Sequence, residues 1–246
     1  MDTIKFKLLQ ARVEGDPVRE REKNSFAVGM GISPDQIETV DMLKGEATFA
    51  SVSDGVDAVI VGGSGDFSVT GNHVWLPNFV KTLGDIASNG FPTFASCFGF
   101  QVMNLALGGK VETDNKGLEV GSHFVERLPD SEGDPLFHDL PTTFVAQQGH
   151  ADRAMVLPQG VSHMASSERC PYQAIKVNGV PVYATQFHPE LTASENKRRF
   201  LQYFDHYIEA VGKEESTRIL NSFQDSTECS HLLKRFKDLV AEKYAG

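Results

Sequence analysis

One stretch decides the fold: residues 91–109, FPTFASCFGFQVMNLALGG. Apolar and small residues at 91–96 predict a short buried strand, and the spacing of apolar residues over 101–107 predicts a helix. Cys97 stands where the strand passes into the helix. The stretch therefore predicts a strand–turn–helix unit with a cysteine at its turn.

Cys97 is the first candidate for a nucleophile. Ala95 and Gly99, two positions to either side, are small, and larger side chains there would collide with a strained turn. The free N–H groups and the dipole at a helix N-terminus also favour a thiolate. The alternative is a buried cysteine that fills a gap in the core, which is the commoner fate of a single cysteine.

Length and composition set the class of protein. The 246 residues fit one large domain, or a domain of about 200 residues with an appendage. The net charge is −10 and the basic residues are scattered, which argues against nucleic acid as a ligand. Cys97, Cys170 and Cys229 form no CxxC pair, so we predict no metal site and a reducing compartment. The N-terminus lacks a signal-peptide core, and no apolar run approaches the ~20 residues of a membrane span, so we expect a cytoplasmic protein away from membranes.

The clearest strand is the continuous apolar run at 57–62, which is typical of a parallel strand covered on both faces. Gly62 and Gly63 end it, and glycines there let the backbone approach a ligand at the C-terminal edge of the sheet. The alternative is a tight turn that needs positive φ. Residues 4–11 and 37–42 are further predicted strands, and 19–30 and 75–86 are predicted helices. The charged run RERE at 19–22 is expected to face solvent.

The second half of the chain predicts a more antiparallel region. Its predicted strands are 118–125, 143–147, 173–177 and 180–186, and Asn178-Gly179 turns the last two into a hairpin. A helix is expected over 194–211 with Ser194 as its N-cap. Residues 214–245 predict a mostly helical, amphipathic tail with a break near Ser226, which we expect to pack on the domain.

His188-Pro189-Glu190 is the second informative stretch. A strand ends abruptly at His188, and an acid two residues further on can reach the imidazole and fix its tautomer, as a catalytic base requires. The alternative is a structural histidine. The Glu190 spacing and the cysteine at the predicted turn favour the catalytic interpretation.

Four motifs in this order resemble the class I (triad) glutamine amidotransferases, most closely the glutaminase portion of GMP synthase and its free-standing relatives. They are Gly62-Gly63, Ala95-x-Cys97-x-Gly99-x-Gln101, His150-x-Asp152 and Gln186-Phe-His-Pro-Glu190. The resemblance covers roughly residues 4–208. It implies Cys97 as nucleophile, His188 as base and Glu190 as orienting acid.

The resemblance also implies positions around the substrate. The backbone N–H groups of Gly63 and Phe98 would form the oxyanion hole. Gln101 matches the family's substrate-contacting glutamine, and the backbone around His150 and Asp152 would border the same pocket; the alternative for these last two is stabilisation of a local turn.

The chain departs from the family pattern at four positions. Ala95, Phe100 and Ala184 stand where the family usually has glycine, histidine and glycine, and Ser64 stands where proline commonly follows the two glycines. Phe100 is expected to remove a polar group near the site and to alter the substrate or the coupling to a partner.

The resemblance leaves three functions open, none of which needs a cofactor. GMP synthase continues into an ATP-using domain with a Ser-Gly-Gly-x-Asp-Ser loop, and the 246 residues contain no such loop. One function is a glutaminase that delivers ammonia to a separate synthase chain. A second is a free hydrolase of γ-glutamyl peptides with the same triad, and a third is a non-catalytic binding or regulatory protein on this scaffold.

The expected fold is an open α/β sandwich with flavodoxin-like layering. A mostly parallel sheet is flanked by helices, and residues 118–186 contribute an antiparallel part. We expect an amidotransferase-like domain at 1–211 and a helical extension at 212–246 packed on it.

Overall fold

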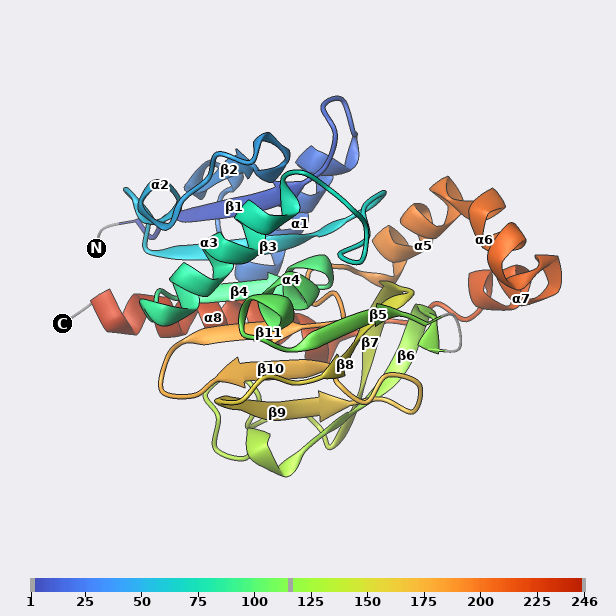
Figure 1. The fold of residues 1–246 in the computed structure, drawn as a ribbon. Coiled ribbons are helices and arrows are strands. Elements are labelled where there is room, and N and C mark those ends of the chain that lie inside the picture. Colours follow the sequence, from blue (N-terminus) through green and yellow to red (C-terminus); the bar gives the residue numbers. More distant parts are fainter. Residues whose placement is uncertain (1–2, 115–116, 245–246) are drawn as a thin grey trace.

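A single nine-stranded sheet runs through the protein in the order β2-β1-β3-β4-β11-β10-β9-β6-β7 (Figure 1). The computed structural model describes residues 3–114 and 117–244. Residues 1–2, 115–116 and 245–246 lie outside the described residues, and with them the first two residues of the predicted domain 1–211 and the last two of the predicted extension 212–246. In sheet order the strands are β2 (Ile37–Asp41), β1 (Phe6–Ala11), β3 (Ala58–Ser64), β4 (Thr93–Ser96), β11 (Val182–Thr185), β10 (Ala174–Val177), β9 (Val161–Ser166), β6 (Glu119–Arg127) and β7 (Thr143–His150).

The sheet divides into a parallel and an antiparallel part. Neighbouring strands from β2 to β11 are parallel, and those from β11 to β7 are antiparallel. The antiparallel part comes from residues 118–186, and β10 and β11 form the expected hairpin. The predicted open α/β fold is confirmed. A separate two-stranded sheet joins β5 (Lys110–Thr113) and β8 (Asp152–Val156).

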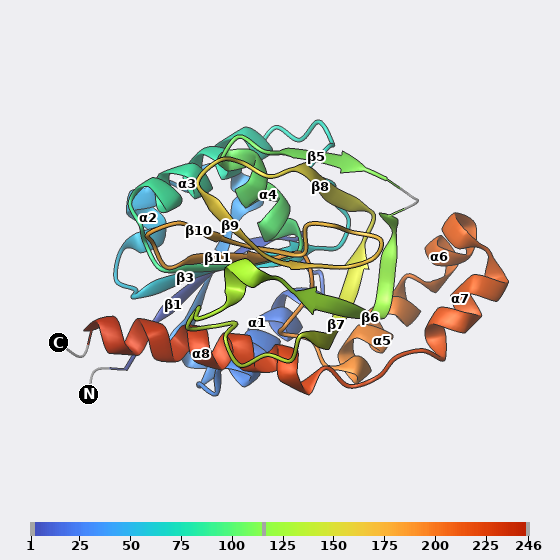
Figure 2. The same ribbon diagram turned by 90° about the horizontal axis from the view of Figure 1, so that it is seen from below.

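Helices cover both faces of the parallel part (Figure 2). One face carries α2 (Phe49–Ser53), α3 (Leu76–Ser88) and α4 (Phe98–Ala106); the other carries α1 (Val18–Met30) and α8 (Thr227–Tyr244). The period of two along a strand produces this arrangement, since alternate side chains point to opposite faces. In β3, Val59 and Val61 lie in the cluster under α3 and α4, whereas Ala58 and Ile60 lie in the cluster under α1 and α8.

The chain leaves β11 at the C-terminal edge of the parallel strands and continues into three short helices there. They are α5 (Ala193–Gln202), α6 (Phe204–Val211) and α7 (Lys213–Leu220). Two details of the predicted helix 194–211 are wrong. Thr192 is the N-cap instead of Ser194, because Thr192 and Glu195 form a reciprocal capping box, and the helix is interrupted at Tyr203.

Three strands and one buried acid differ from the sequence prediction. Strands β5, β8 and β9 were not among the predicted strands, and β5 is mostly exposed, so it has no apolar alternation to reveal it. The prediction that the RERE run at 19–22 faces solvent is wrong at Glu22, which is fully buried, whereas Glu20 and Arg21 are exposed.

Helix α8 packs within the main core. Its buried residues Leu232, Leu233 and Phe236 belong to the same cluster as the β1 side chains. Contact with α1 is so close that a Cβ on Gly29 would lie 2.7 Å from Leu233 Cδ1. The boundary at residue 211 stays a prediction, and α8 forms a layer of the sandwich.

We expect Phe236→Ala to lower the free energy of unfolding by about 3–5 kcal/mol, because it opens a cavity between α8 and the sheet. The Phe236 ring centroid lies 5.6 Å from that of Phe94 and 6.5 Å from that of Tyr183. Urea unfolding measures the change. Exposed Lys234 on the same helix gives the matched control, and Lys234→Ala should stay within about 0.5 kcal/mol of the native protein. Equal stability of the two variants would contradict the place of α8 in the core.

Candidate active site

Cys97 occupies a strained turn between β4 and α4. Its φ of 53° and ψ of −103° make it the one non-glycine residue with positive φ in the part of the chain that the structure describes. Hydrogen bonds hold this conformation: Cys97 N–H donates to Thr185 O at 2.8 Å, and Gln101 N–H donates to Cys97 O at 3.1 Å. The predicted strand–turn–helix unit is therefore present with the cysteine at its turn.

The small residues on either side of Cys97 fit into different surroundings. A Cβ on Gly99 would lie 2.8–2.9 Å from Val61 atoms, so glycine lets α4 approach β3. Ala95 is fully buried and aligned with Val61 and Ala184 on the neighbouring strands. Phe100 is fully buried in the core and does not line the hollow beside Cys97, so the expected change of substrate contacts at Phe100 does not arise by direct contact.

His188 and Glu190 form a buried pair near Cys97. His188 Nδ1 lies 2.6 Å from Glu190 Oε1, so the ring donates from Nδ1 to the carboxylate. Ser96 fixes the other carboxylate oxygen, since its hydroxyl donates to Glu190 Oε2 at 2.9 Å. The three predicted triad residues are all buried, with 4–6% of each exposed.

The electrostatics favour a charged pair. Burial lowers the pKa of His188, but the Glu190 carboxylate and then Cys97 outweigh burial, and the net pKa is raised to about 10. Burial raises the pKa of Glu190, but His188 and Arg199 outweigh it and hold that pKa below its usual value. The surroundings thus favour a protonated His188 beside an ionised Glu190.

Two polar neighbours of the triad were not found from the sequence. Ser96 binds Glu190, and Gln186 Nε2 lies 3.7 Å from Cys97 Sγ as a donor to the sulfur. Both adjoin recognised motifs, since Ser96 precedes the cysteine and Gln186 begins the histidine stretch. Their position next to these motifs was the sequence signal that could have indicated a role for them in the site.

A hollow of about 330 Å³ lies beside Cys97. Gln101, His150 and Asp152 all line it, as predicted for substrate positions. Gln101 Nε2 is engaged within the protein, because it donates to Asp152 O at 2.8 Å and to Gln186 Oε1 at 3.2 Å. The Asp152 carboxylate accepts from the hydroxyls of Ser68 and Thr113, which closes the outer wall of the hollow.

The His150 side chain turns inward. Its Nδ1 lies 3.1 Å from Asp152 O and its Nε2 lies 3.3 Å from Glu119 Oε2. Ligand atoms of Glu119, His150 and Cys170 lie within 4.8 Å of one another, a spacing that could hold a metal ion. However, Glu119 already accepts hydrogen bonds from Ser167 and Gln173 at 2.7 and 2.6 Å. The cluster is therefore satisfied as a hydrogen-bond network that fixes His150.

Gly63 is engaged in a way that differs from the prediction. Its N–H, an expected oxyanion donor, donates instead to Glu22 Oε1 at 3.1 Å. Arg12 holds the same carboxylate by an ion pair of 2.9 Å. Neither Gly62 nor Gly63 has positive φ. A Cβ on Gly62 would lie 2.6 Å from Glu22, and one on Gly63 would lie 3.2 Å from His188, so close approach explains both glycines.

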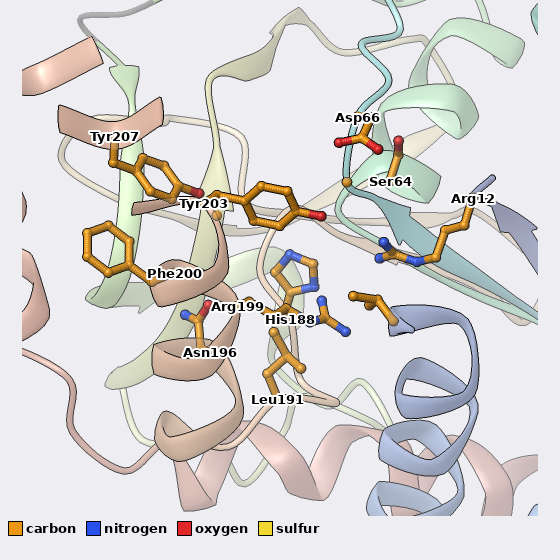
Figure 3. A pocket seen from close by; sticks show the side chains of 13 residues that line it. Arg12, Ser64, Asp66, His188, Leu191, Asn196, Arg199, Phe200, Tyr203 and Tyr207 are labelled. Carbon is orange, nitrogen blue, oxygen red and sulfur yellow. The ribbon is translucent and has the colours of Figure 1, made fainter. Parts of the chain in front are cut away.

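A second hollow, of about 390 Å³, is lined by His188 and its neighbours (Figure 3). It shares Ser64, Gly65, Asp66 and Gly149 with the first hollow but does not include Cys97. The remaining lining comes from the end of β1, from α1, from the segment after β11 and from the region of α5 and α6. Its residues are Arg12, Val18, His188, Leu191, Asn196, Arg199, Phe200, Tyr203 and Tyr207.

A family model described as glutamine amidotransferase class-I matches residues 36–207. The match spans more than half of the chain. The chain belongs to the class I glutamine amidotransferase family, whose members are cysteine-dependent enzymes, and the predicted resemblance is confirmed.

Relatives of this chain include glutamine-hydrolysing GMP synthases. It is 28% identical over 183 residues to that of Thermosipho melanesiensis, which covers 74% of this chain and 32% of the relative. It is 36% identical over 139 residues to that of Limosilactobacillus reuteri, and this match covers 56% of this chain and 26% of the relative. The chain thus spans about a third or less of the length of these relatives.

Solved structures agree on the fold. A glutamine amidotransferase from Thermotoga maritima matches with a TM-score of 0.72 at 20% identity, over 98% of this chain and 100% of that chain. One from Methylobacillus flagellatus matches with a TM-score of 0.68 at 17% identity, over 97% of this chain and 92% of that chain. In the described residues, no helix is both long and apolar enough to cross a membrane.

The His188–Glu190 pair predicts a pH-dependent stability. The raised pKa of His188 adds stability that is fully present below the unfolded pKa of about 6.5 and is lost as the pH rises through about 10. We therefore expect the native protein to lose its stability advantage over His188→Gln across this range, as measured by urea unfolding. Exposed Val28→Thr changes no titratable group; it is the control, and its gap to the native curve should stay constant with pH. A constant gap between native protein and His188→Gln would refute the coupling.

Proposed function

We propose that the chain hydrolyses γ-glutamyl amide bonds, with glutamine as the simplest substrate, through Cys97, His188 and Glu190. The observation that carries this proposal is the 2.6 Å hydrogen bond between His188 and Glu190 beside a cysteine on a strained strand-to-helix turn. Family membership supports the choice of an amide substrate.

Cys97 is the nucleophile in this proposal. Its sulfur attacks the γ-carbonyl carbon, the C–N bond breaks, and His188 gives a proton to the leaving nitrogen. Glutamine thereby yields ammonia and a γ-glutamyl thioester on Cys97. Water then attacks the thioester as His188 takes its proton, and glutamate leaves as the sulfur is released. Glu190 keeps the ring in the correct orientation and stabilises its protonated form.

The oxyanion that forms during attack needs donors. Phe98 is the first residue of α4, and N–H groups in the first turn of a helix have no acceptor within the helix. Gly63 is the second proposed donor, and its N–H must exchange the Glu22 carboxylate for the oxyanion. One oxyanion donor contributes on the order of 3 kcal/mol to the barrier in known hydrolases.

The substrate's glutamyl part is proposed to occupy the hollow beside Cys97. Gln101 would face it with the oxygen of its amide, because the nitrogen is engaged within the protein. The backbone of His150 and Asp152 would form the opposite border, since the His150 ring turns inward.

When glutamine is the substrate, the released ammonia needs an acceptor, and for that reaction we propose a separate synthase chain as the partner. The proposal is supported by the GMP synthases among the relatives, of which this chain spans about a third or less. The buried and mutually oriented triad side chains favour catalysis over a purely regulatory role for the scaffold.

We expect Cys97→Ala to abolish glutamine hydrolysis and to keep the fold, because it removes the nucleophile and leaves the packing nearly unchanged. Glutamate release and the thermal unfolding midpoint measure the two effects. A glutamine-mimicking electrophile should label Cys97 in the native protein, as located by mass spectrometry of its peptides. Cys229→Ala, in the core on α8, is the control and should be labelled like the native protein. Full glutaminase activity of Cys97→Ala would sink the assignment.

A further inference from the structure

The second hollow, which His188 lines and Cys97 does not, is suited to receive a leaving group. The general acid has to touch the departing nitrogen, whereas the acyl group stays with the nucleophile and the oxyanion donors. Cys97 and Phe98 line one hollow, and His188 lines the other. An amide bound across the shared segment would therefore place its acyl half beside Cys97 and its amine half beyond His188.

Ammonia does not need such a space. It is about the size of a water molecule, whose share of liquid volume is about 30 Å³. The hollow beyond His188 measures about 390 Å³. It has room for an amine of many atoms.

The lining of this hollow contains an arginine with one unsatisfied buried donor. Arg199 Nη2 is buried and has no hydrogen-bond partner among the described residues. Figure 3 shows the Arg199 guanidinium beside the His188 ring. A buried charged donor without a partner is costly, and an anionic oxygen bound there would remove that cost.

The other arginine of the hollow differs. Arg12 is paired with Glu22 at 2.9 Å and with Asp16 at 3.3 Å, and these three side chains are almost fully buried. Its charge is already balanced within the protein. Arg199 acts electrostatically on Glu190, yet its Nη2 has no hydrogen-bond partner among the described residues, so it is the arginine of this hollow with a donor left for a carboxylate.

Apolar and aromatic side chains form much of the remaining wall. Leu191 and Phe200 are buried beside Arg199, and Tyr203 extends toward the side of Arg12 and Ser64 (Figure 3). Burial raises the pKa of Tyr207 to about 12, so that phenol remains a neutral donor. This combination suits a small organic group that carries one carboxylate.

We propose that this hollow is a leaving-group subsite in which Arg199 binds the carboxylate of an amino acid, so that the chain cleaves γ-glutamyl amino acids. The inference rests on the proposed Cys97 hydrolysis and names its substrate class. Cys97 sulfur bonds to the γ-carbonyl carbon, the bond from that carbon to the amino-acid nitrogen breaks, and that nitrogen takes a proton from His188. Water then releases glutamate, so one amide and one water yield glutamate and a free amino acid.

A matched pair of substrates tests the subsite. γ-Glutamylalanine and γ-glutamylethylamide differ by the carboxylate alone, and glutamate release gives kcat/KM for each. We expect the native protein to prefer γ-glutamylalanine by at least tenfold. Equal values for the two substrates would overturn the subsite.

Variants then identify the binding residue. Arg199→Gln should lower kcat/KM for γ-glutamylalanine by about 10–100-fold more than for the ethylamide, the range expected for a lost hydrogen bond between charged groups. Arg198→Gln, an exposed neighbour on α5 that does not line the hollow, should keep the native preference. An equal fall for both substrates in Arg199→Gln would instead mean that Arg199 acts through Glu190, and it would overturn the proposed contact.

The same experiment separates failure of the subsite from failure of the chemistry. Electrophile labelling of Cys97 together with equal rates for the matched pair would reject the subsite alone. Absence of both labelling and glutamate release from every substrate would reject the hydrolysis on which the subsite rests.

Discussion

The strained backbone at Cys97 is the constraint on which the rest of the structure depends. A non-glycine residue in such a conformation costs of order 1–3 kcal/mol and persists only where its surroundings fix it. Here the surroundings are Thr185 on β11, which accepts the Cys97 N–H, and Val61 on β3, against which Gly99 packs. The turn therefore forms only when the central parallel strands are side by side. Burial of those strands on both faces supplies the free energy that keeps the strain.

Two buried ion pairs border the strand end at Gly63. His188–Glu190 lies on one side and Arg12–Glu22 on the other. The first pair is part of the proposed chemistry. The second holds an N–H that the same chemistry would use, because Glu22 accepts from Gly63. In the proposed chemistry an anionic transition state and the Glu22 carboxylate would compete for one donor, so the position of Glu22 would bear on how readily the oxyanion forms.

The sequence was informative where burial and local chemistry coincide. The run 57–62 and the stretch around Cys97 are apolar on both faces, so their periodicity and turn residues predicted β3, β4 and α4. Strand β5 is mostly exposed, and its four residues carry no such pattern. The end of β11 could be predicted from Pro189, but the N-cap of α5 was misplaced although Thr192 and Glu195 have capping-box spacing.

The candidate site shows the same division. Cys97, His188 and Glu190 could be predicted because each follows a strand that ends at one edge of the sheet. The engagement of Gly63 could not, because it depends on Glu22, one acid in a charged run whose burial is decided by Arg12 on another element. Arg199 likewise looks like an ordinary helix-surface cation until α5 is placed against His188.

The burial of α8 has a consequence for synthesis of the chain. Strand β1 is synthesised before α8, yet its side chains Phe6 and Leu8 share a core with Leu232 and Phe236 of that helix. Until α8 has emerged, the face of the sheet that it will cover remains open to water and to other chains. Domains generally fold as units during translation, and an exposed apolar face invites aggregation. Strand β1 therefore has its full core only after translation has passed α8, and the sheet edge that carries Cys97 and His188 depends on the same step.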